Sequence, residues 1–148
     1  MKAADYLITL ALAATVLNIA LPVGTLMSAP MRMQEQLVGN VIYITGGVGR
    51  SEAAVMRNFA KDYLLEVSFI QKQPGQREEF LADVKVQILD EQQNVVLDVT
   101  TDGPFLLANL PQGNYLVTAE HHGEAKQQKV NVDANKHQKI EFKWLVSE

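Results

Sequence analysis

Hydrophobic and polar residues alternate with a period of two over most of the second half of the chain. Leu65, Val67 and Phe69 would point to one side of a strand, and Glu66 and Ser68 to the other. The same alternation recurs in further short runs, at 84–88, 95–99, 115–119, 130–132 and 140–144, and a mainly apolar run at 105–110 predicts another short strand, closed by Pro111. Turn residues separate these runs at intervals of roughly ten residues, which favours an all-β sandwich over repeated βαβ units.

One segment near the start of this folded part has a different period. A β-branched and aromatic run at 41–44 predicts a first strand, which ends at the turn Gly46-Gly47-Val48-Gly49. Apolar residues then recur at spacings of three and four, which predicts one amphipathic helix at about 51–62 with Ser51 as its N-cap. The stripe that this helix should bury consists of Val55, Met56, Phe59 and Tyr63. The predicted fold is therefore mainly β: one Ig-like sandwich of about seven strands with a short N-terminal helix.

The N-terminus is nearly all apolar from residue 6 to residue 21, and a lysine precedes this run. Its length fits the core of a signal peptide better than a membrane span, which needs about 20 apolar residues. We predict a signal-peptide helix at 1–29, a linker at 30–39 and one sandwich domain at 40–148, located in the periplasm. An uncleaved membrane anchor is an alternative because apolar residues continue to Met27, and a buried helix of the domain is another.

Charge and composition exclude several classes of function. The formal net charge of −4 and the isoelectric point near 5.4 give no basic surface for nucleic acid, and the sequence has no polybasic stretch for anionic lipid. The chain has no cysteine, which excludes disulfides, thiolate metal sites and a nucleophilic cysteine. The absence of a thiol is compatible with an oxidising compartment.

Two turn motifs stand out in the second half of the chain. They are Thr101-Asp102-Gly103-Pro104-Phe105 and Leu110-Pro111-Gln112-Gly113-Asn114-Tyr115. Their glycines supply turn conformations, Pro111 presets φ, and Tyr115 should anchor a strand in the core. Together with the strand at 82–90, they resemble the carboxypeptidase regulatory-like domain, a transthyretin-like β-sandwich whose signature is Leu-Pro-x-Gly-x-Tyr. The front half, 43–69, is similar to small exported proteobacterial proteins that carry this domain.

This resemblance implies a non-catalytic periplasmic module that binds an envelope protein or a glycan. Regulatory domains of this kind usually lack catalytic residues, so no catalytic residue, metal or cofactor is expected. No nucleic acid is expected as a partner, and membrane contact is expected only through an uncleaved leader. Transthyretin-like hydroxyisourate hydrolases carry a C-terminal Tyr-Arg-Gly-Ser signature, which is absent from residues 143–148. An accessory subunit that acts by β-strand addition is a further alternative.

His121 and His122 motivate the alternative of a small periplasmic hydrolase or metal-binding protein. Neighbouring residues on a strand point to opposite faces, so the two rings are predicted to diverge on the hairpin surface unless the turn distorts it. His137 lies farther along the chain, and no clear acidic triad completes a metal site.

Three other features have a structural interpretation. The turn Gly46-Gly47-Val48-Gly49, with Arg50 beside it, matches neither phosphate-binding fingerprint and is predicted to be a plain turn. Trp144 is predicted to seal the core, and a place in an interaction patch is the alternative. Four aspartates recur at strand ends and are predicted to form Asx-turns rather than a calcium site: Asp90, Asp98, Asp102 and Asp133.

Overall fold

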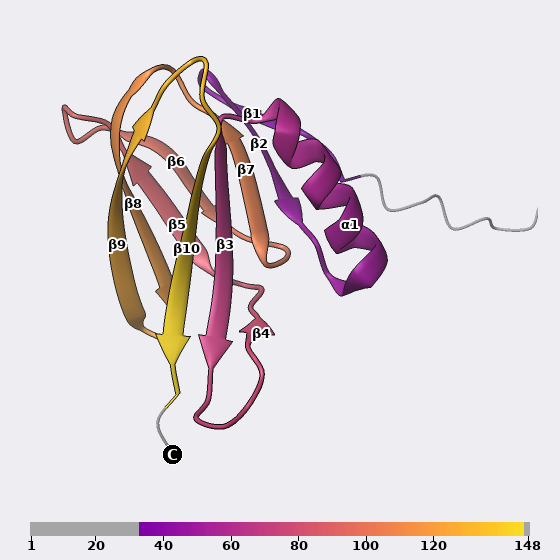
Figure 1. Cartoon of the computed structure of the whole chain (residues 1–148). Helices are drawn as coiled ribbons and strands as arrows, with labels where there is room; N and C mark the ends of the chain where they lie inside the picture. Colours follow the sequence, from indigo (N-terminus) through magenta and orange to yellow (C-terminus); the bar gives the residue numbers. More distant parts are fainter. Residues whose placement is uncertain (1–32, 147–148) are drawn as a thin grey trace, which may run out of the picture. The chain divides into compact units, whose positions relative to one another are not determined.

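The computed structural model describes residues 33–146, which form two packed β-sheets with one helix on the outside (Figure 1). The predicted signal peptide at 1–29 lies outside the described residues. Ten strands, one α-helix and a 3₁₀ turn follow in this order: β1 (Gln36–Val38), β2 (Val41–Gly46), α1 (Gly49–Phe59), η1 (Ala60–Asp62), β3 (Leu65–Lys72), β4 (Glu79–Phe80), β5 (Lys85–Leu89), β6 (Val95–Thr100), β7 (Phe105–Asn109), β8 (Gly113–His121), β9 (Glu124–Val132) and β10 (Gln138–Leu145).

The first sheet, which we call sheet A, has six strands and is organised around β3. Its order is β1-β2-β7-β3-β10, and β4 pairs with the far end of β3, beyond the end of β7. Strand β10 runs parallel to β3 over its whole length, from Gln138 opposite Leu65 to Leu145 opposite Lys72. Strand β3 therefore has a hydrogen-bonded neighbour on each side and lies inside the sheet (Figure 1).

The second sheet, sheet B, has four strands in the order β6-β5-β8-β9, and its pairs are antiparallel. Strands β8 and β9 form the longest hairpin, from Gly113 opposite Val132 to His121 opposite Glu124. The residues between the last pair, His122 and Gly123, both have positive φ, as a tight two-residue hairpin turn requires. This turn fixes one end of the sandwich.

The main core lies between the two sheets. The predicted alternation in β3 is confirmed, because Leu65, Val67 and Phe69 are all fully buried in this core. The rings of Phe69 and Phe142 stack at a centroid distance of 6.1 Å. Trp144 is 3% exposed and belongs to the same cluster, which confirms its predicted place in the core.

Helix α1 adds a third layer by packing on the outer face of sheet A. A second apolar cluster joins its buried side to the sheet: Ile44, Met56, Ala60, Tyr63, Phe105 and Leu107. Sheet A is thus covered on both faces beneath α1. Within residues 33–146, no helix is long and apolar enough to cross a bilayer.

Two details of the predicted helix are wrong. The helix begins at Gly49 with Val48 as its N-cap, so Ser51 lies inside the first turn and does not cap it. The buried stripe is formed by Met56 and its neighbours in the second cluster, whereas Val55 and Phe59 are 41% and 40% exposed. The apolar flank that Val55 and Phe59 form therefore stays partly exposed to solvent.

The strand count and the start of the domain also differ from the prediction. Ten strands form instead of about seven, because short pieces such as β1 and β4 pair with longer neighbours. The predicted linker at 30–39 is wrong for 36–38, which form β1, and for Met33, which packs against the cluster under α1.

Glycine is required where two turns cross beside Phe105. A Cβ atom on Gly103 would lie 2.4 Å from the backbone carbonyl of Gly46, and one on Gly47 would lie 2.4 Å from the Phe105 ring. The turns are also joined through Thr45, whose Oγ1 atom lies 3.1 Å from an Asp102 carboxylate oxygen and accepts the Asp102 N–H. The glycines therefore allow the strand β2 and the turn before β7 to pack in contact.

We expect Gly103→Ala to destabilise the fold by about 2–3 kcal/mol, because the added methyl group meets backbone that cannot move aside cheaply. The matched control is Gly75→Ala, which has open space around its Cβ position and should cost about 1 kcal/mol for its positive φ. Urea denaturation of both variants gives the comparison. Equal losses would show that the crossing is loosely packed.

Candidate functional site

Three turns meet at one end of the sandwich and enclose an open cleft of about 590 Å³, which we call the end cleft. They are the connections from β1 to β2, from β5 to β6 and from β7 to β8. Its polar lining residues are Asn40, Asp90, Glu91, Gln92, Gln112 and Asn114. Of the lining residues that the structure describes, none is a lysine or arginine. The cleft thus combines carboxylates with neutral amides.

Asp90 fixes the β5–β6 side of the end cleft. Its Oδ1 atom accepts the backbone N–H of Gln92 at 2.9 Å and that of Asn94 at 2.8 Å. This is the Asx-turn that the sequence predicts, and Asp133 forms another with the N–H of Asn135 at 3.0 Å. The Asp90 carboxylate is therefore occupied by the backbone, so its main role is to hold the turn.

Tyr115 and Asn114 fix the opposite wall. The buried Tyr115 donates its hydroxyl hydrogen to the carbonyl oxygen of Pro111 at 2.6 Å. Burial, followed by the negative charges of Asp90 and Glu91, raises the pKa of Tyr115. The Asn114 side chain donates to Glu91 and accepts from Asn131 at 2.7 Å.

Three amide side chains remain for a ligand. Asn40, Gln92 and Gln112 are exposed, and none of these side chains makes a hydrogen bond within residues 33–146. A second open groove, of about 840 Å³, lies against the same β5–β6 hairpin and shares Asp90, Glu91, Asn114 and Tyr115 with the end cleft. A pre-formed wall with unoccupied amides is able to bind polar, uncharged groups.

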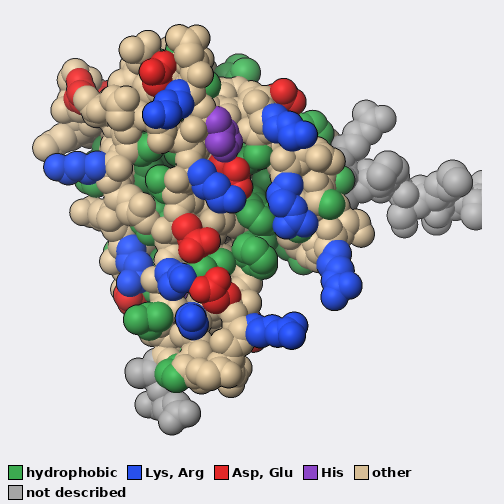
Figure 2. Space-filling view, viewed as in Figure 1, with side chains coloured by type: hydrophobic (Ala, Val, Ile, Leu, Met, Phe, Trp, Pro, Cys, Tyr) green, Lys and Arg blue, Asp and Glu red, His purple; other side chains and the backbone are tan. Residues whose placement is uncertain are grey.

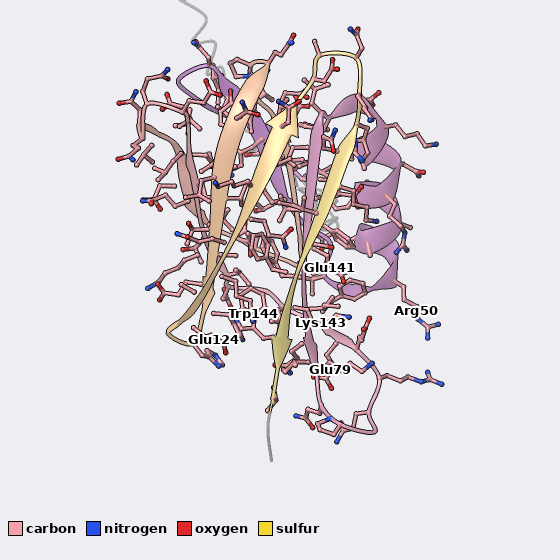
Figure 3. The ribbon with its side chains drawn as sticks, turned by 60° about the vertical axis from the view of Figure 1, so that its left-hand side comes forward. Arg50, Glu79, Glu124, Glu141, Lys143 and Trp144 are labelled. Atoms are coloured by element: carbon pink, nitrogen blue, oxygen red, sulfur yellow. The ribbon has the colours of Figure 1, made fainter. Side chains whose placement is uncertain are left out.

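The histidine pair lies at the other end of β8, and its predicted geometry is wrong. The rings of His121 and His122 do not diverge but stack at a centroid distance of 4.0 Å. The strand rule fails here because His122 belongs to the hairpin turn, with φ at +47°, and this backbone turns its side chain over that of His121. Figure 3 shows Trp144 and Glu124 at this same end.

Packing of the pair against Trp144 limits its chemistry. The His121 ring meets the Trp144 ring edge-on at 5.8 Å, and the indole N–H donates to the Glu124 carbonyl at 3.1 Å. The Nδ1 atom of His121 is buried without a hydrogen-bond partner among the described residues, so no carboxylate orients it as a general base. Burial, then the neighbouring His122, lowers the pKa of His121. No cluster of three or more metal-ligating side chains occurs within 33–146.

Sequence reasoning missed a buried polar cluster on the outer face of sheet A. Glu66 is 5% exposed, and its carboxylate contacts Lys139 Nζ at 3.3 Å and His137 Nε2 at 3.2 Å. The other ring nitrogen of His137 lies 2.7 Å from the Tyr63 carbonyl, which can only accept a hydrogen bond. His137 donates both bonds when its ring carries both protons.

The pairing of β10 with β3 explains why the sequence gave no signal of this cluster. Lys139 lies opposite Glu66 in the parallel ladder, although the two residues are far apart along the chain. Tyr63 extends the cluster, because its hydroxyl donates to Glu35 just before β1. Burial and the Glu35 carboxylate raise the pKa of Tyr63. The cluster thus links the N-terminal segment, the end of η1 and the strands β3 and β10.

The turn before α1 is tied to the helix by Glu52. The Glu52 carboxylate accepts the Gly47 N–H at 3.1 Å, so a negative charge already occupies the start of the helix. Arg50 is exposed and extends away from the fold at this point (Figure 3). An anion would meet the Glu52 charge here, which argues against phosphate binding.

No protein-family model matches this chain, and no curated protein matches it. The resemblance to the carboxypeptidase regulatory-like domain therefore remains a prediction from the turn motifs.

We expect the stability of the fold to decrease with acid because of His121. Its pKa is lowered in the folded state, so below about pH 6.5 the unfolded chain binds a proton that the folded chain resists. Stability is therefore unaffected above this pH and falls as the pH drops towards the folded-state value. Thermal melts of the wild type and His121→Gln between pH 7.5 and 5 test this. The variant should lose part of the slope, whereas His122→Gln should lose less.

We expect the Glu66 cluster to contribute to stability through its two partners. Replacing both, as His137→Leu with Lys139→Met, leaves a buried carboxylate uncompensated and should cost about 2–3 kcal/mol. Lys129→Met with Lys136→Met, at exposed positions, is the matched control and should change stability by less than about 0.5 kcal/mol. Chemical denaturation at pH 7 measures both. A small loss in the first pair would show that water solvates Glu66 adequately.

Proposed function

We propose that this protein is an exported, non-catalytic β-sandwich module of the cell envelope that binds a glycan segment in the end cleft. The observation that carries the proposal is the lining of that cleft, in which neutral amides stand beside carboxylates without a described lysine or arginine. Sugar hydroxyls both donate and accept hydrogen bonds, and a side-chain amide does the same. The volume of about 590 Å³ falls within the usual range of small-molecule sites.

Charge favours an uncharged ligand over an anionic one. Asp90 and Glu91 both line the cleft, so a phosphate or carboxylate would meet two negative charges there. The exposed Val38 and Val95 give it apolar surface against which the carbon face of a sugar ring can pack. The wall is pre-formed because Asp90, Tyr115 and Asn114 are held by hydrogen bonds, which lowers the entropy cost of binding.

A transthyretin-like, carboxypeptidase regulatory-like architecture is part of the proposal. It is supported by the Leu110–Tyr115 motif, whose tyrosine is buried and whose turn forms a wall of the end cleft. A non-catalytic role is supported by the histidine pair, because His121 packs on Trp144 and has no orienting carboxylate among the described residues. Periplasmic location rests on the apolar N-terminal run of the sequence.

β-Strand addition is a weaker candidate for the function. Strand β1 forms an edge of sheet A, and its Leu37 and Val38 side chains are exposed, as an acceptor edge requires. However, β1 spans three residues, which leaves few backbone groups for an added strand. The end cleft offers more specific contacts.

We expect the protein to bind chitotriose, a neutral oligosaccharide probe, with backbone amide shifts in NMR spectra at the three turns of the end cleft. The double variant Asn40→Ala with Gln112→Ala should weaken binding about tenfold, because each lost neutral hydrogen bond contributes about 0.5–1.5 kcal/mol. Gln127→Ala with Asn135→Ala, at exposed positions outside the cleft, is the matched control. If neither chitotriose nor maltotriose shifts the cleft resonances, the glycan proposal fails.

A further inference from the structure

The exposed side of α1 and η1 carries a row of basic side chains. Arg50, Arg57 and Lys61 follow one another at spacings of seven and four residues, so helical periodicity places them along one flank. All three are exposed, and none forms an ion pair with another residue of 33–146. Figure 2 shows lysine and arginine side chains gathered over the helix on the right of the view.

The opposite flank of the helix is apolar and also exposed. Val55 and Phe59, one turn apart, are 41% and 40% exposed, and Val48, just before the helix, is 58% exposed. A helix with cations on one face and exposed apolar side chains on another is typical of helices that lie on a membrane surface. The aliphatic stems of arginine and lysine allow their charged groups to reach headgroups while the flank approaches the bilayer.

The acidic residues of these two elements, Glu52 and Asp62, offset part of this positive charge. The Glu52 carboxylate accepts the Gly47 N–H at 3.1 Å, so its charge is held at the turn before the helix. Asp62, at the end of η1, is the remaining exposed carboxylate of these two elements. The surface is therefore positive on balance, although the whole chain carries a net charge of −4.

The start of the described chain lies against this same helix. Met33 packs against the cluster beneath α1, next to Met56 and Phe105. Residues 22–32 connect it to the apolar run at 6–21, and at 3.3–3.6 Å per residue they span at most about 40 Å. A bilayer that holds the apolar run therefore stays within reach of α1. A tether of this length makes a second, weak contact effective.

We propose that α1 and η1 form a docking surface for an anionic phospholipid bilayer. Arg50, Arg57 and Lys61 contact the headgroups, and Phe59 with Val55 enters the interface. The sequence predicts membrane contact only through an uncleaved leader, and this docking surface adds a second contact. It uses none of the residues of the end cleft, so it stands apart from the proposed glycan binding.

The test uses the full chain, residues 1–148, reconstituted into vesicles of phosphatidylcholine with and without 30% phosphatidylglycerol. Because the chain has no cysteine, Ala54→Cys in α1 and Asp98→Cys in sheet B each accept a single environment-sensitive fluorophore. Quenching by lipids that carry a nitroxide should be at least threefold stronger at position 54 than at position 98. This difference should require the anionic lipid and should fall in 0.5 M NaCl, where charges are screened.

Charge reversal separates docking from mere proximity. Each basic residue near an anionic surface strengthens partitioning about fivefold, so Arg50→Glu with Arg57→Glu and Lys61→Glu should abolish the quenching at position 54. The control is Lys72→Glu with Lys129→Glu and Lys136→Glu, which changes the net charge equally and should leave the quenching unchanged. The proposal is overturned if quenching is equal at positions 54 and 98 or equal in both lipid compositions. It is also overturned if the two triple variants have equal effects, or if the chain does not associate with the vesicles.

Discussion

Burial of β3 on both faces is the constraint on which the rest of this structure depends. Its inner residues Leu65, Val67 and Phe69 pack between the sheets, whereas Glu66 and Ser68 lie on the outer face of sheet A, beside the part of β2 and β7 on which α1 packs. In a two-layer sandwich this second face would meet water, and its polar residues would need no partners. Here Glu66 has His137 and Lys139 as partners, and the Ser68 hydroxyl is buried without one among the described residues.

The same arrangement separates scaffold from candidate function. Because β3 has a hydrogen-bonded strand on each side, the turns at either end of the sandwich project from a rigid support. At one end, Asp90 and Tyr115 tie their own turns to the backbone and leave a polar cleft between them. At the other end, His121 stacks on His122 and meets Trp144 edge-on, and burial followed by the neighbouring His122 lowers its pKa. The two ends therefore differ in what they offer to a ligand.

Helix α1 has a double role in this scheme. Its buried side, around Met56, makes sheet A a two-sided layer. Its outer side leaves Phe59 partly exposed on the flank opposite a row of cations that form no ion pair within residues 33–146, a combination that a purely structural helix does not need. The sequence showed no polybasic stretch because these cations are spread over more than two helical turns. Their gathering depends on the helical period.

The sequence by itself determined the strands of the sandwich, the Asx-turn of Asp90 and the buried position of Trp144. These features depend on alternation and on side-chain–backbone contacts between near neighbours, which the order of residues specifies directly. Tertiary structure alone decided the parallel pairing of β10 with β3, the burial of Glu66, the stacking of His121 on His122 and the end cleft. The strand pairing, the Glu66 cluster and the end cleft bring together residues that are far apart along the chain. The stacked histidines result from a turn in which the strand alternation does not hold. Local periodicity in the sequence indicates neither the long-range pairing nor the turn geometry.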